Sequence, residues 1–165
     1  MIIFRCTRPL AKRFGLELLE SSEISTGVLG DWYATRLNVA SHRLVLCISE
    51  RSLLPVLMPA RKREFPDRFA DHLAPILKFV GISAPLIERE IDNYRDAAFA
   101  PTRSKQILGS LNDFGQSARF MILSSPNRCS PAEANLKLVE MPCKPIDYSF
   151  PADVVRSLFD VAGRA

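Results

Sequence analysis

The chain has 165 residues, of which 47% are hydrophobic and 24% charged, with a formal net charge of +4 and a pI near 9.0. These values are typical of one globular domain with a sizeable core, and they exclude an intrinsically disordered chain. No apolar run approaches the roughly 20 residues of a membrane-spanning helix. The first residues are apolar before they are basic, the reverse of a secretory signal, so we expect a cytoplasmic protein without membrane segments.

Hydrophobic periodicity in the first third of the chain predicts strands. A short strand is expected at Ile2–Cys6, and alternation of apolar and polar residues over 33–39 is typical of a half-buried strand. The continuous apolar run at 44–48 indicates a central strand. Residues 53–58 predict a third strand of this group, which Pro55 places at a sheet edge. Together these segments predict an antiparallel meander.

The rest of the chain reads mainly as helices. An apolar stripe predicts a long amphipathic helix that ends at Gly81, and Ser83 begins another. A fourth strand is expected over 95–100, and a core helix over 103–124. A Pro-rich segment, 126–150, leads to a terminal helix. The whole pattern predicts a single α+β domain over residues 1–165, with a meander of three to four strands packed against several helices.

Glycines inside the 103–124 helix are unusual. Gly109 and Gly115 each cost about 1 kcal/mol relative to alanine in a helix interior. The usual reason for accepting that cost is the close approach of another backbone, which we therefore expect at both positions.

Polar residues of the same helix form the first candidate ligand-binding site. Its members are Arg103, Ser104, Ser110, Asn112 and Asp113. A helix beginning at Ser104 would place N–H groups beside the Arg103 guanidinium, which suits a phosphate or carboxylate. Ser110 and Asp113 share a face one turn apart, whereas Asn112 points away. In the structural alternative, Ser104 is only an N-cap and Asp113 pairs with Arg103 or another basic group.

Two further features are candidates for binding. Trp32 is the only tryptophan, and at a strand start it would either stack on a ligand ring or plug the end of the sheet. Arg61, Lys62 and Arg63 form a candidate basic surface, which is either a phosphate-binding face or a solubility feature.

Metal ions and cofactors are not indicated. Four cysteines lie far apart without a C-x-x-C spacing, which favours buried thiols over a metal site or disulfides. His42 and His72 have no partner at a ligand spacing. Phosphate-loop, dinucleotide and nucleophile-elbow motifs are missing from the sequence. We therefore expect neither a metal nor a cofactor.

Two stretches resemble a bacterial family that is known only as a domain of unknown function. They are Leu29-Gly30-Asp31-Trp32-Tyr33-Ala34, and Arg103-Ser104 with Leu108-Gly109-Ser110-Leu111-Asn112-Asp113. Members of this family start with an M-I-I-R-C-T-like stretch and carry an N-R-S-V-L-G-S-M-N-D-like segment. Thr102, Lys105 and Gln106 depart from that second pattern. The resemblance covers about residues 1–125, and it implies a single-domain intracellular bacterial protein without assigning a catalytic role.

Three functions remain open from the sequence. The first is a small non-enzymatic module that binds a protein or a nucleic acid, with Trp32, Arg103, Ser110 and Asp113 lining its groove. The second is a hydrolase or transferase for a phosphate-bearing substrate, in which Asp113 is the base and Arg103 the electrostatic clamp. The third is a homo-oligomeric assembly protein that pairs through its edge strand at 53–58.

Overall fold

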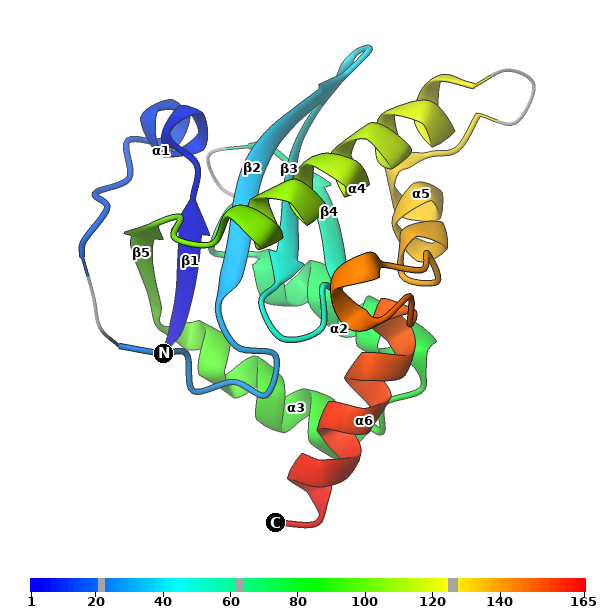
Figure 1. Cartoon of the computed structure of the whole chain (residues 1–165). Coiled ribbons are helices and arrows are strands. Elements are labelled where there is room, and N and C mark those ends of the chain that lie inside the picture. The colour runs from blue at the N-terminus through cyan, green and yellow to red at the C-terminus, as the bar shows by residue number, and fades with distance from the viewer. Residues whose placement is uncertain (21–22, 62–63, 125–127) are drawn as a thin grey trace.

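A mixed β-sheet forms the centre of the computed structural model, which describes residues 1–20, 23–61, 64–124 and 128–165 (Figure 1). Its strands are β1 (Ile2–Cys6), β2 (Trp32–Val39), β3 (His42–Ser49), β4 (Pro55–Pro59) and β5 (Ala97–Pro101). Their order across the sheet is β4-β3-β2-β1-β5. Each segment that the periodicity predicts as a strand is therefore a strand of this sheet.

Helices cover both faces of the sheet (Figure 1). One face carries α4 (Lys105–Leu123) and α5 (Pro131–Leu138), and the other carries α2 (Phe69–Val80), α3 (Ala84–Asp92) and α6 (Pro151–Gly163). The short helix α1 (Arg8–Phe14) follows β1 and contacts β2, and the 3₁₀ turns are η1 (Asn93–Arg95) and η2 (Lys144–Ile146). Within the described ranges, no helix is long and apolar enough to cross a membrane.

Two apolar cores lie on opposite faces of the sheet, because successive side chains of a strand point to opposite sides. Trp32 packs with Phe4 and Phe69 in the core under α2, whereas its neighbour Tyr33 belongs to the core under α4. Residues 44–48 of β3 are buried on both faces, which confirms the prediction of a central strand from their continuous apolar run.

The mixed sheet corrects the predicted antiparallel meander. Strands β2, β3 and β4 pair antiparallel, as expected, but β1 pairs parallel with both β2 and β5. Phe4 stands opposite Trp32 on one side and Phe99 on the other. The connection from β1 to β2 runs through α1 and residues 15–31, which is long enough for a parallel crossover. Periodicity identifies strands but not their partners, so this pairing was missed.

Strand β4 lies at an edge, as Pro55 predicted, but a side chain already occupies its outward backbone groups. Asn135 of α5 accepts a hydrogen bond from the Leu57 N–H at 2.7 Å and donates one to the Pro55 carbonyl at 2.8 Å. This amide takes the place of a further strand. Pairing between subunits through 53–58, on which the homo-oligomer alternative depends, would have to displace it.

The two glycines of α4 do not meet another backbone. A Cβ added at Gly115 would lie 3.6 Å from Leu37 Cδ1 and 3.8 Å from Leu46 Cδ2, which is ordinary side-chain packing. At Gly109 it would meet nothing within 4 Å. The expected backbone approach is therefore wrong at both positions, and Gly109 faces open space instead.

Candidate functional site

Arg103 lies between β5 and α4, and carboxylates hold its guanidinium. Its Nη2 atom is 3.1 Å from Glu50 Oε1 and 3.5 Å from Asp31 Oδ2. The hydrogen bond to Glu50 is the main reason why the pKa of Arg103 is raised above its ordinary value. The predicted ligand-binding arginine is therefore part of an ion-pair network, although about half of its side chain is exposed.

A buried ion pair lies behind Arg103. Arg5 Nε is 2.7 Å from Asp31 Oδ2, and the two side chains are only 3% and 1% exposed. The other oxygen of Asp31 accepts hydrogen bonds from the Ser25 backbone N–H at 3.0 Å and the Ser25 hydroxyl at 2.8 Å. The sequence did not predict this pair, because a strand pattern does not show which polar residue of a buried face will find a partner.

Two polar atoms beside this pair are buried without a hydrogen bond of good geometry to any described residue. They are Arg5 Nη2 and the Tyr33 hydroxyl. Arg5 and Tyr33 stand opposite each other in the register of β1 and β2. The Tyr33 hydroxyl also makes a smaller contribution to the raised pKa of Arg103. The side chains of Arg5 and Tyr33 are both buried, and neither residue lines one of the hollows described below.

Trp32 lies in the core on the opposite face of the sheet from α4. Its side chain is fully buried, and the indole N–H donates to the Tyr94 hydroxyl at 2.7 Å. Its ring meets Phe69 edge-on, with centroids 4.8 Å apart. This is the plug arrangement that the sequence left open. It separates Trp32 from Ser110 and Asp113, with which it was grouped.

Ser104 and Ser110 both have local hydrogen bonds. Ser104 is the N-cap of α4, and its hydroxyl accepts the Ile107 N–H at 3.3 Å. Ser110 is buried, and its hydroxyl donates to the Gln106 carbonyl one turn earlier at 3.4 Å. Asn112 is exposed and stands apart from this face, as its place on the helical wheel predicts.

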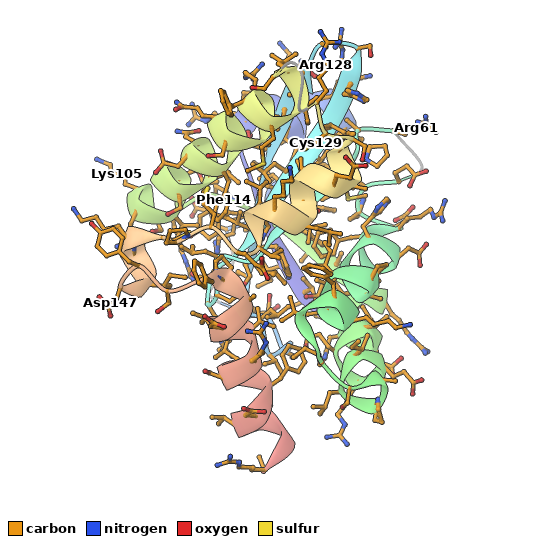
Figure 2. The ribbon with its side chains drawn as sticks, turned by 90° about the vertical axis from the view of Figure 1, so that its right-hand side faces the viewer. Arg61, Lys105, Phe114, Arg128, Cys129 and Asp147 are labelled. Carbon is orange, nitrogen blue, oxygen red and sulfur yellow. The ribbon has the colours of Figure 1, made fainter. Side chains whose placement is uncertain are left out.

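Ser110 and Asp113 line a hollow of about 410 Å³, defined here as the α4 hollow, between α4 and the 141–148 segment. Figure 2 shows Lys105 at the start of α4 and Asp147 in the neighbouring loop on the same side of the molecule. Its lining residues are Lys105, Gln106, Gly109, Ser110, Asp113, Phe114, Met141, Pro142, Cys143, Lys144, Pro145 and Tyr148. Arg103 and Ser104 are not among them, so only two of the predicted site residues meet here.

The separation of Arg103 from Asp113 bears on the hydrolase alternative. Arg103 binds Glu50 and Asp31, whereas Asp113 forms no ion pair within the described part of the chain and borders the α4 hollow. A clamp and a base in different surroundings would not act on one substrate. The cations that do accompany Asp113 are Lys105 and Lys144, which sequence reasoning missed. The only signal for Lys144 was its place between two prolines.

Cys143 is the one thiol of the α4 hollow. Burial raises the pKa of this thiol to about 11, and the negative charge of Asp113 contributes to the rise. The thiol is therefore protonated at neutral pH, which does not favour a nucleophile. Burial likewise raises the pKa of the Cys6 thiol to about 12. This agrees with the prediction that Cys6 behaves as a small buried hydrophobe.

A groove of about 650 Å³ lies at the other end of the molecule, where β3 and β4 meet the start of α5. Arg61 of the predicted basic surface lines it together with Arg13 and Arg43. Figure 2 shows Arg61 and Arg128 toward this end, far from Asp147. Lys62 and Arg63, the other members of the predicted surface, lie outside the described residues.

A second hollow, of about 640 Å³, adjoins the groove, because Arg13 lines both. It lies between α1 and the exposed half of β2, and its other cations are Arg8, Lys12 and Arg36. We call the six cations that line these two hollows the basic end. They are Arg8, Lys12, Arg13, Arg36, Arg43 and Arg61.

Carboxylates are absent from the described lining of both hollows of the basic end. Elsewhere the hollows contain them: the α4 hollow has Asp113, one beside α3 has Glu90, and one beside α2 has Asp71 and Glu88. None of the six cations forms an ion pair with a described residue. The small net charge of the whole chain therefore conceals a local surplus of positive charge.

A comparison of the sequence with known protein families identifies one that matches. The sequence model of one family, described as a domain of unknown function (DUF6933), matches residues 3–154. The chain belongs to this family. No curated protein and no solved structure matches it.

The DUF6933 match confirms the resemblance to a family of unknown function and extends it. It continues past residue 125 through α5 and into the start of α6, so it includes both walls of the α4 hollow. All six cations of the basic end also fall within the matched residues. In the described part of this DUF6933 chain, no group of three or more His, Cys, Asp or Glu side chains could hold a metal ion.

Proposed function

We propose that the chain is a non-enzymatic binding module that holds the phosphate backbone of a nucleic acid across its basic end. The observation that carries this proposal is the pair of adjoining hollows lined by six cations without a carboxylate. Phosphate contacts supply most of the sequence-independent affinity of proteins for nucleic acids. The proposal keeps the binding module expected from the sequence and moves its site from α4 to the opposite end of the sheet.

The kind and spread of these cations favour phosphate. Five of the six are arginines, whose planar guanidinium binds a phosphate with two parallel hydrogen bonds. They are distributed along two hollows that share Arg13, so one extended chain of phosphates can contact both. A single acidic side chain of a protein partner would use only one of them. A nucleic acid therefore fits the basic end better than a protein does.

Fluorescence anisotropy with labelled oligonucleotides of about 20 residues, at about 50 mM salt, tests the proposal. Arg13→Ala combined with Arg36→Ala should weaken binding to any sequence by about tenfold or more, because both side chains are exposed and border the hollow between α1 and β2. Arg89→Ala combined with Arg164→Ala removes the same charge from exposed positions outside the basic end. Equal losses for the two double variants, or no binding by the native protein, would contradict the proposal.

A further inference from the structure

The α4 hollow has the size and lining of a small-molecule site, and it lies away from the basic end (Figure 2). Its volume of about 410 Å³ falls within the range of about 300–1,000 Å³ that is usual for ligand pockets. Phe114, Met141 and two prolines give it an apolar floor, and a few charged groups stand around that floor. Such a lining orients a ligand through its polar groups and holds it through its apolar part.

One wall is a stripe along α4. Gln106, Gly109, Ser110 and Asp113 recur at the spacing that places helical residues on one face. Gly109 stands in the middle of this stripe, where an added Cβ would meet nothing within 4 Å. A glycine here leaves space in the hollow that any other residue of a helix would fill. Gly109 therefore keeps part of the hollow open, which explains a glycine at a position where no other backbone packs against the helix.

The other wall is a loop whose backbone holds an aromatic ring at the mouth of the hollow. Asp147 and Tyr148 both have left-handed backbone angles, with φ of 54° and 58°, a conformation that residues with a side chain rarely adopt. Hydrogen bonds from Tyr148 N to the Cys143 carbonyl at 2.9 Å and from Cys143 N to the Ser149 carbonyl at 3.1 Å close the loop. Tyr148 remains 66% exposed. Strained backbone of this kind is characteristic of ligand clamps.

Charged groups line both walls of the hollow. Lys105 occupies the first turn of α4, where the helix dipole adds to its positive charge, and Lys144 faces the same hollow from η2. Asp113 is eight residues further along, about 12 Å along the helix axis. A ligand spanning the hollow would thus meet the Lys105 cation and, further along the α4 wall, a hydrogen-bond acceptor, with the second cation on the opposite wall.

We propose that the α4 hollow binds a small molecule in which a phosphate is joined to a planar ring, of the size of a nucleoside monophosphate. The two lysines attract the phosphate, and Tyr148 with the prolines offers the flat surface on which a ring stacks. Asp113 repels a second anion but accepts a hydrogen bond from a sugar hydroxyl or a ring amino group. An inorganic phosphate would leave most of the hollow and its apolar floor unused.

Calorimetric titration of the full chain with AMP, CMP, GMP and UMP tests this inference. At least one of the four should bind, whereas adenosine and inorganic phosphate should each bind at least about tenfold more weakly, because each lacks half of the contacts. Lys144→Ala and Tyr148→Ala should each weaken the binding of that same nucleotide. Lys137→Ala, an exposed lysine outside the hollow, should not.

Gly109→Leu gives a variant that keeps the fold. Its side chain enters open space within the hollow, and leucine favours a helix more than glycine does. It should abolish nucleotide binding, retain the far-ultraviolet circular dichroism of the native protein and leave oligonucleotide binding at the basic end unchanged. If none of the four nucleotides binds, or if Gly109→Leu and Lys144→Ala bind as the native protein does, the inference is wrong. Neither result would affect the proposed function at the basic end.

Discussion

Arg5 and Asp31 form an ion pair that joins three strands. Arg5 of β1 contacts Asp31, immediately before β2, at 2.7 Å, and its Nη1 atom donates to the Pro101 carbonyl at the end of β5 at 3.3 Å. Helix α4 begins four residues after Pro101. The pair therefore fixes the parallel part of the sheet and, through it, the point from which α4 and its hollow extend.

Asp31→Ala should destabilise the protein strongly. The substitution leaves the buried Arg5 guanidinium without its carboxylate, and removing one partner of a buried pair usually costs about 3–5 kcal/mol. Urea unfolding followed by circular dichroism measures this loss. Asp92→Ala, which breaks the exposed pair with Arg95, should change the free energy of unfolding little. If the two variants have similar stability, the buried pair does not have the structural role assigned to it.

Asn135→Ala should weaken the junction of α5 with the sheet edge. It removes the acceptor of the Leu57 N–H and the donor to the Pro55 carbonyl, and the unsatisfied buried groups should cost about 1–3 kcal/mol. Because the outward groups of β4 then lose their cover, the variant should also self-associate more than the native protein. Sedimentation velocity measures the second effect. A variant with the stability and the sedimentation coefficient of the native protein would show that the amide is dispensable.

Glu90 should contribute a pH dependence to stability. Burial raises the pKa of its carboxyl above the ordinary value of 4.5, although the hydrogen bond from the Val28 N–H partly opposes this. The folded state therefore holds the proton more tightly than the unfolded state. The resulting stabilisation is complete below about pH 4.5 and is lost as the pH rises through the pKa of the folded state.

The comparison with Glu90→Gln isolates this contribution. The free energy of unfolding of the native protein, minus that of the variant, should fall as the pH rises from 4.5 toward neutrality. Chemical denaturation at a series of pH values gives the difference at each point. A difference that increases with pH would mean that the hydrogen bonds from the 28–29 backbone outweigh burial.

Gly109→Ala should stabilise the protein by about 1 kcal/mol, because alanine favours a helix interior and its Cβ meets nothing at this position. A rise in the thermal midpoint measures the effect. Gly115→Ala is the matched comparison within the same helix, since its Cβ would contact Leu37 and Leu46 at ordinary distances. A loss of stability at Gly109 would contradict the open surroundings described for it.

Local features of the fold were predictable from the sequence, whereas the pairing of distant segments was not. The alternation over 35–39 of β2 follows from burial on one face, and the apolar run in β3 follows from burial on two faces. The edge position of Pro55 follows from its missing N–H. The parallel pairing of β1 with β5 joins segments more than 90 residues apart, and no local pattern encodes it.

The same distinction applies to the candidate site. Ser104 as an N-cap, and Ser110 with Asp113 on one face, are consequences of helical spacing and were predictable. The lysine and tyrosine of the opposite wall come from a Pro-rich segment without periodicity, so nothing connected them to α4. Arg103 was assigned to a ligand because its partners, Asp31 and Glu50, are remote in sequence.

The salt dependence of nucleic-acid binding tests the central claim most directly. The logarithm of the binding constant should fall linearly with the logarithm of the salt concentration, because each phosphate contact releases counterions. Combining Arg13→Ala with Arg36→Ala should reduce the magnitude of that slope by about two, one contact for each arginine removed. An unchanged slope in this double variant would contradict a phosphate-binding role for the basic end.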